Sequence, residues 1–126
     1  MNVSDVLERE PLVVPMNESA GSVWARMRQR GVDHVVVVDA KLRVVGVVSS
    51  DDLGGPSGGT HRRMGRTVGQ LMHRDPASVT VRTSVRRAAA LMRARHTGCL
   101  PVLRGEKLVG LVTVGALLSV LERANP

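Results

Sequence analysis

The chain has 126 residues, 43% of them hydrophobic and 23% charged, which is enough for one ordinary globular domain or two half-size units. Its apolar residues are almost all aliphatic, because Trp24 is its only aromatic residue, and the formal net charge is +7. These numbers exclude disorder along the whole length, and the longest uncharged run, residues 108–121, falls short of the ~20 residues that a membrane-spanning helix needs.

The first predicted elements are two helices with a strand between them. Ser4 is placed to cap a short opening helix, and a strand follows over residues 12–14. The next segment has the apolar spacing of an amphipathic helix, which Gly31 ends. The apolar face of that helix consists of Ala20, Val23, Trp24 and Met27.

Two valine-rich strands come next, over residues 35–38 and 44–48, with a turn between them at 39–41. Their β-branched residues hardly alternate with polar ones, which indicates strands covered on both faces. A last helix should begin after Ser49, but the Gly54-Gly55-Pro56 sequence cuts it short. We predict a flexible Gly/Arg-rich linker over residues 54–66.

The second half of the chain repeats this order of elements. Thr67 caps a short helix, a strand follows over residues 78–81, and Ser84 caps an amphipathic helix. That helix places Val85, Ala88, Ala89 and Met92 on one face and arginines on the other. Strands over 100–103 and 108–112 are joined by a turn at 104–106, and a full-length helix begins after Thr113.

The two halves align with an offset of 65 residues, or 64 after a deletion in the second hairpin, and identical pairs recur in order along the alignment. The helices and strands of the two copies predict an α/β (α+β) fold. Because one copy exposes too much apolar sheet to fold alone, we expect the two copies to pack together. In this fold, two motifs, each a small three-stranded sheet with helices, pack pseudo-twofold, sheet to sheet, and leave a cleft between them. The expected divisions are motif 1 over 1–53, the linker over 54–66 and motif 2 over 67–126.

The segment Gly46-Val47-Val48-Ser49-Ser50-Asp51-Asp52-Leu53 resembles the signature of the cystathionine-β-synthase-type (CBS) motif, which is Gly-hydrophobic-x-Thr/Ser-x-x-Asp. The second copy has Cys99-Leu100-Pro101-Val102 and Gly110-Leu111-Val112-Thr113 in the same style. The resemblance covers essentially the whole chain. It implies a tandem CBS pair, also called a Bateman module, that senses adenosine nucleotides, regulates a partner enzyme or transporter, and forms a homodimer.

Ser49 and Asp52 are three residues apart where a strand meets a helix, so both side chains project from one turn. The carboxylate can accept from both hydroxyls of a ribose, while the Ser49 hydroxyl and nearby N–H groups can donate to phosphate or sugar oxygens. Helix capping alone explains the same residues.

The resemblance also implies the rest of the ligand site. By position, Ser49 and Asp52 would face Thr67, Met72, Thr97, Gly98 and Cys99, with a contribution from Val47. His34 would present a basic group to phosphate, or serve as a structural histidine at a strand edge. His61, Arg62, Arg63 and Arg66 would close over a polyphosphate. In the second copy Thr113 keeps the hydroxyl, but Ala116 replaces the carboxylate, so a second site should be degenerate.

Catalysis and metal binding have little support in the sequence. Cys99 lacks an adjacent base and fits a buried filler, and the four histidines show no metal-ligand spacing. We therefore expect no enzyme activity, no metal and no obligatory cofactor, with AMP, ADP, ATP or S-adenosylmethionine as the ligand. The lone cysteine and the absence of signal-peptide features at the start favour a cytoplasmic protein.

Two other functions remain open. Residues 1–53 carry six bases and eight acids, whereas residues 68–126 carry nine bases and three acids, which suggests an anionic partner for the second half. Non-specific nucleic-acid binding fits that charge, although the chain lacks an aromatic platform for stacking bases. A ligand-free dimerisation or docking module that regulates a partner protein fits the aliphatic helices.

Overall fold

The computed structural model describes residues 1–56 and 59–124. Ser57 and Gly58 of the predicted linker, like Asn125 and Pro126, lie outside the described residues. The chain divides into two compact units. Leu12–Pro76 form the first-copy unit, and Met1–Pro11 together with Ala77–Pro126 form the second-copy unit. The opening segment of each repeat therefore packs with the strands of the other repeat, so the compact units and the sequence motifs divide the chain differently.

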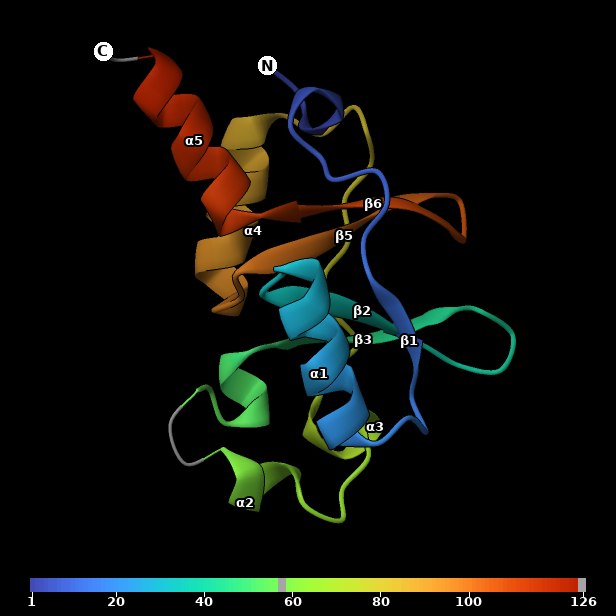
Figure 1. The fold of residues 1–126 in the computed structure, drawn as a ribbon. Coiled ribbons are helices and arrows are strands. Elements are labelled where there is room, and N and C mark those ends of the chain that lie inside the picture. The colour runs from blue at the N-terminus through green and yellow to red at the C-terminus, as the bar shows by residue number, and fades with distance from the viewer. Residues whose placement is uncertain (57–58, 125–126) are drawn as a thin grey trace. The chain divides into compact units, whose positions relative to one another are not determined.

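The first-copy unit contains a four-stranded sheet with the order β1-β2-β3-β4 (Figure 1). β1 runs parallel to β2, and β3 is antiparallel to both β2 and β4. The elements of this unit are β1 (Val13–Pro15), α1 (Ala20–Arg30), β2 (His34–Val38), β3 (Val44–Ser49), the 3-10 helix η2 (Asp51–Leu53), α2 (Thr60–Arg63), α3 (Val68–Leu71) and β4 (His73–Arg74).

The second-copy unit contains the two-stranded antiparallel sheet β5-β6. Single bridges extend this sheet at both edges, because Val79 pairs in parallel with Val102 and Glu8 pairs antiparallel with Leu111. These bridges repeat the β1-β2 and β3-β4 pairings of the first-copy unit. The elements are the 3-10 helix η1 (Val3–Asp5), α4 (Val85–Arg95), β5 (Cys99–Arg104), β6 (Lys107–Thr113) and α5 (Val114–Ala124).

The expectation of three strands in each copy is therefore wrong in detail, while the α/β class is confirmed. The first-copy sheet gains a fourth strand from the start of repeat two. The predicted strand over residues 78–81 is reduced to the single bridge at Val79, because its other backbone groups have different partners. The Thr80 N–H donates to the Thr83 hydroxyl, and the carbonyls of Val81 and Thr83 accept from the opening segment.

The valine-rich runs form strands that are covered on both faces, as predicted. Val35, Val36 and Val37 of β2 are all fully buried. In each unit the buried aliphatic side chains of the strands pack against the amphipathic helix, so one small core lies in each unit. Among the described residues no polar or charged residue is buried.

The predicted N-cap of α4 at Ser84 and the predicted end of α1 at Gly31 are confirmed. The hydroxyls of Ser19 and Ser84 accept from the N–H groups of Ser22 and Arg87 in the first turns of α1 and α4. Gly31 ends α1 in the left-handed conformation with φ of 66°. His96 takes the same conformation at the end of α4, with φ of 52°.

The short opening helices differ between the copies. Thr67 caps α3 in a capping box with Gln70, as predicted. Ser4 is not the N-cap of the first copy, because it lies inside η1. The N-cap is Asn2, whose backbone N–H donates to Asp5 Oδ2 at 2.9 Å. An acid three residues after Asn2 completes a capping box, and the prediction from Ser4 did not include that pairing.

The predicted linker includes an ordered helix, α2, in addition to its glycines. The copy-one helix after Ser49 is only the 3-10 helix η2, which ends at Gly54, whereas α5 in copy two has the predicted length. Across the described residues, every helix is too short or too polar to pass through a lipid bilayer.

Candidate functional site

The end of β3 and the start of η2 form a turn in which Ser49 and Asp52 bond to each other. The Ser49 N–H donates to Asp52 Oδ2 at 2.8 Å, and the Asp52 N–H donates to Ser49 Oγ at 3.2 Å. This reciprocal pair is a capping box in which aspartate takes the place of glutamate. It fixes the orientation of the carboxylate, and it leaves Oδ1 directed away from the turn.

Asp52 Oδ1 lies 2.9 Å from His73 Nε2, which makes His73 a neighbour of the candidate site. β4 brings it there, because His73 pairs with Val47 of β3. The His73 side chain is 66% exposed and that of Asp52 is 21% exposed, so solvent reaches this pair. Sequence reasoning missed His73, because only the pairing of β4 with β3 connects residues 52 and 73.

His34 begins β2 directly opposite Ser49 in the β2-β3 pairing. Its partial burial lowers the pKa of the imidazole, and the carboxylates of Asp33, Asp52 and Asp51 oppose that shift only in part. The neutral form is therefore favoured at neutral pH. An arriving phosphate would act in the opposite direction by stabilising the imidazolium.

Two further predicted residues are Val47, which lies in β3, and Met72, which lies beside it. Val47 is 3% exposed, so its side chain is part of the protein interior. Met72 precedes β4 and packs against Gly46, where an added Cβ would collide with the methionine side chain. The structure thus brings His34 of β2, Val47 and Ser49 of β3, Asp52 of η2 and Met72, which precedes β4, to adjoining positions in the first-copy unit.

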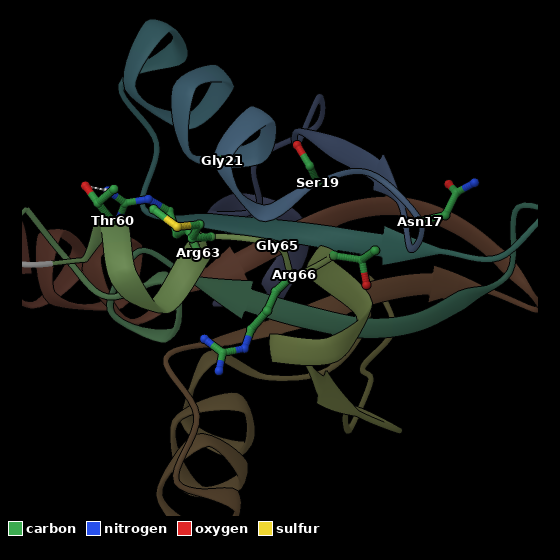
Figure 2. A pocket seen from close by; sticks show the side chains of 9 residues that line it. Asn17, Ser19, Gly21, Thr60, Arg63, Gly65 and Arg66 are labelled. Carbon is green, nitrogen blue, oxygen red and sulfur yellow. Dashed lines mark hydrogen bonds between the residues drawn. The ribbon is translucent and has the colours of Figure 1, made fainter.

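Thr67 lies elsewhere in the first-copy unit. Besides capping α3 it bridges to Ser19, and it lines a pocket of about 430 Å³ whose lining does not include Ser49 or Asp52. Figure 2 shows this pocket between the start of α1, at Ser19 and Gly21, and the segment that carries Thr60, Arg63 and Arg66.

The remaining predicted residues belong to the second-copy unit. Thr97 Oγ1 donates to the Cys99 carbonyl at 3.1 Å, and the Gly98 carbonyl accepts from Val114 N–H at 2.8 Å. Cys99 itself is 1% exposed. The bond between Gly98 and Val114 ties the segment before β5 to the start of α5.

Thr113 and Ala116 form the counterpart of the Ser49 and Asp52 turn. The Ala116 N–H donates to Thr113 Oγ1 at 3.2 Å, which repeats the bond from the Asp52 N–H to Ser49 Oγ in the first copy. Ala116 has no carboxylate to return the bond or to accept from a ligand. The second copy therefore keeps this bond of the turn and loses its negative charge.

The linker arginines bind backbone carbonyls around η2. Arg62 Nε donates to the Asp52 carbonyl at 2.6 Å, and Arg63 donates to the Leu53 carbonyl at 2.9 Å. Arg66 donates to the Arg62 carbonyl at 2.6 Å. These contacts hold α2 against the candidate site. Over the described part of the chain, no group of three or more His, Cys, Asp or Glu residues is arranged to hold a metal ion.

Comparison with curated proteins identifies distant relatives that have no described activity. The chain is 29% identical over 124 residues to the uncharacterized protein MJ1404 of Methanocaldococcus jannaschii, with 88% of this chain and 30% of that protein covered. It is 27% identical over 120 residues to an uncharacterized 17.7 kDa protein of Acidianus ambivalens, with 94% and 72% covered. The chain thus spans less than a third of the length of the first of these relatives.

Solved structures with the same fold include complexes with adenosine compounds. The CBS domain pair of protein MJ0100, in complex with 5′-methylthioadenosine and S-adenosyl-L-methionine, superimposes with a TM-score of 0.88 at 20% identity, covering 99% of this chain and 98% of that chain. CBSX2 of Arabidopsis thaliana, in complex with AMP, gives a TM-score of 0.77 at 25% identity, covering 99% and 98%.

The family model for the CBS domain matches residues 3–53 and 68–123, which include both repeats and nearly all of the described chain. The match covers the Ser49 and Asp52 turn in the first copy and the Thr113 turn in the second. This chain is a member of the CBS domain family and carries two copies of its motif.

Proposed function

We propose that the chain is a regulatory module, not an enzyme, and that it binds the ribose of an adenosine nucleotide through Asp52. The observation that carries this proposal is the reciprocal bond between Ser49 and Asp52, which orients a partly exposed carboxylate at the end of β3. Such a carboxylate can accept from the two adjacent hydroxyls of a ribose.

The Asp52 carboxylate is available for this role because its two oxygens have different partners. Oδ2 is held by the Ser49 N–H, while Oδ1 contacts only a solvent-exposed histidine, His73, among the bonds seen in the described residues. An exposed contact of this kind contributes little to stability, so ribose hydroxyls can replace or join it at low cost.

The comparison with CBSX2 supports the class of ligand. That protein is 25% identical to this chain over nearly the full length of both, and it was solved with AMP. We infer an adenosine nucleotide for this chain, with AMP, ADP and ATP as the first compounds to test and S-adenosylmethionine as the fourth. We also infer a single carboxylate-dependent site, because Ala116 replaces the acid in the second copy.

Thermal unfolding with each of the four compounds tests the proposal. A ligand that binds only the folded state stabilises it by about 2.7 kcal/mol at a concentration of 100 times Kd. Asp52→Asn should lose most of this gain, since the amide keeps an acceptor for the Ser49 N–H but removes the charge. Asp51→Asn is the matched control, because it removes the same charge from the exposed neighbouring residue and should keep the gain.

Two results would contradict the proposal. If none of the four compounds raises the unfolding temperature, the chain is not an adenosine sensor. If Asp52→Asn and Asp51→Asn respond equally to the nucleotide, Asp52 does not bind the ribose. Stabilisation by nucleic acid that falls steeply with salt and is the same in both variants would favour the nucleic-acid alternative.

A further inference from the structure

The pocket between the start of α1 and the segment that leads from α2 to α3 is separate from the Asp52 turn (Figure 2). All of its lining residues belong to the first-copy unit, and neither Ser49 nor Asp52 is among them. Its volume of about 430 Å³ is within the range of roughly 300–1,000 Å³ that small-molecule sites have. The pocket is therefore large enough for a ligand of its own.

The lining of this pocket is positively charged. It includes Arg63 and Arg66 and no acidic residue, and in the part of the chain that the structure describes neither arginine forms an ion pair. Glu18, on the segment that enters α1, is occupied elsewhere, because its carboxylate oxygens bond to Ser22 Oγ at 2.8 Å and to Arg26 Nη1 at 2.6 Å. The uncompensated charge favours an anion in the pocket.

Arg66 is held in place and still has donors to offer. Its Nη1 donates to the Arg62 carbonyl at 2.6 Å, and Figure 2 shows the side chain extending toward α2. A guanidinium has five N–H donors in a fixed plane, so this one bond orients the group and leaves the other donors available. Arg63 is more fully used, because its Nη1 already donates to the carbonyls of Leu53 and Gly55.

Uncharged donors lie on other sides of the pocket. The hydroxyls of Ser19 and Thr60 accept from Ser22 N–H at 3.1 Å and from Arg63 Nη2 at 3.5 Å, so each hydroxyl keeps its own proton to donate. The Gly21 N–H is in the first turn of α1, where an N–H has no acceptor within the helix. Donors from α1, α2 and the segment after α2 therefore surround one space.

This distribution of donors suits a phosphate group better than a carboxylate. A phosphate monoester has three terminal oxygens that accept hydrogen bonds in different directions, whereas a carboxylate has two oxygens in one plane. The pocket also has an apolar side, because Met64 lines it with a side chain that is 68% exposed. A ligand with both a phosphate and a small organic part would use both features.

We propose that this pocket binds a small phosphorylated metabolite. Arg66 is the main cationic contact of the phosphate group, and Met64 covers the organic part. The pocket does not include the Asp52 turn, so the proposal goes beyond the proposed nucleotide function and does not depend on it.

The experiment titrates the full chain with glycerol 3-phosphate and follows the backbone amides by NMR. We expect the resonances of Gly21, Gly65 and Thr67 to shift and to reach saturation. Glycerol, and potassium chloride at equal ionic strength, are the controls and should cause no saturating shift at these residues. Inorganic phosphate should bind about threefold more weakly or worse, because it has no carbon atoms for Met64 to cover.

Replacing the main cationic contact tests the charge of the pocket. Arg66→Gln should weaken the binding of glycerol 3-phosphate by about tenfold or more, because it removes charge-assisted hydrogen bonds. Arg74→Gln is the matched control, since Arg74 is an exposed arginine of the same unit that does not line the pocket. It should leave the affinity unchanged.

Gly21 allows a second test that removes no side chain from the pocket. A Cβ added there would meet nothing within 4 Å, so Gly21→Gln and Gly21→Glu should both fold. The two new side chains have nearly the same size, but only glutamate brings a negative charge next to the phosphate. Gly21→Glu should therefore bind glycerol 3-phosphate about tenfold more weakly than Gly21→Gln, or worse.

The proposal is overturned if glycerol 3-phosphate causes no more shift than chloride, if Arg66→Gln binds like the parent, or if the two Gly21 variants bind equally. Equal affinity for inorganic phosphate also overturns it, because the pocket then takes the free ion. Asp52→Asn should bind glycerol 3-phosphate normally, and a loss of binding in that variant would place the phosphate at the Asp52 turn instead. If the nucleotides fail to bind while glycerol 3-phosphate binds as expected, only the proposed nucleotide function is wrong.

Discussion

Arg63 lies with its guanidinium carbon 4.2 Å from the centroid of the Trp24 ring while the same side chain donates to the Leu53 carbonyl at 2.9 Å. One side chain of the linker thus joins α1 to the end of η2. A segment whose composition predicts flexibility is therefore anchored at its helix α2, and it covers the only aromatic ring of the chain.

Replacing Arg63 by alanine should release this anchor. We expect Arg63→Ala to lower the free energy of unfolding by about 1–2 kcal/mol, since it removes a cation–π contact and hydrogen bonds to two backbone carbonyls, those of Leu53 and Gly55. Trp24 emission should shift to longer wavelength, because water then reaches the indole. Arg28→Ala is the matched control: its guanidinium lies farther from the ring, at 5.8 Å, so it should change both readouts less. Equal effects of the two variants would contradict the anchoring role.

The missing carboxylate in copy two can be restored. Ala116→Asp should stabilise the protein by about 0.5–1 kcal/mol, because an acid in the first turn of α5 can accept from the Thr113 N–H as Asp52 does from Ser49. Chemical denaturation measures the change. Ala116→Asn supplies an acceptor without charge and should give a smaller gain. A loss of stability in both variants would show that the second turn cannot form a reciprocal box.

Partial burial of His34 predicts a dependence of stability on pH. Its pKa in the folded chain is lowered from 6.5, so the unfolded chain binds a proton more readily. The stability that comes from this group is fully present above pH 6.5 and is lost as the pH falls through 6.5 toward the lower folded pKa. His34→Gln should therefore lose less stability than the parent between pH 7.5 and 5.5, as measured by urea denaturation at each pH. Parallel curves for the two proteins would contradict this prediction.

Local patterns in the sequence predict much of the fold. Ser84 begins α4 and Gly31 ends α1, as predicted, because these signals act within one or two turns of the backbone. The valine runs predict β2 and β3 for the same local reason. The features that were not predicted depend on pairing between distant segments. Glu8 bridges to Leu111, and residues 73–74 pair with β3 as β4, and no local propensity encodes either pairing.

The candidate site divides in the same way. The three-residue spacing of Ser49 and Asp52 indicates that both lie on one turn, and they do. The contact of Asp52 with His73 spans 21 residues and depends on the β3-β4 pairing, so the sequence does not reveal it. The cation–π contact of Trp24 likewise depends on where α2 lies, which the glycine-rich composition of the linker obscures. The ligand-binding roles of these residues remain predictions.

The close approach of strands at Gly46 and Gly110 predicts a sharp contrast with a third glycine. A Cβ at Gly46 would lie 2.9 Å from the His73 carbonyl oxygen and collide with the Met72 side chain, and one at Gly110 would lie 2.7 Å from the Glu8 carbonyl oxygen. Because these neighbours are backbone atoms of paired segments, Gly46→Ala and Gly110→Ala should each cost about 1–3 kcal/mol of stability.

Gly21 in α1 is the matched control for that prediction, since an added Cβ would meet nothing within 4 Å. Gly21→Ala should stabilise the protein by about 0.5–1 kcal/mol, because alanine loses less backbone entropy than glycine when a helix forms. Urea denaturation of the three variants measures all of these changes on one scale. Gly46→Ala should additionally weaken nucleotide binding, because moving β4 away from β3 carries His73 and Met72 away from the Asp52 turn. If Gly46→Ala and Gly110→Ala are as stable as the parent, the prediction is contradicted. The backbone at His73 and Glu8 would then have room for an added Cβ.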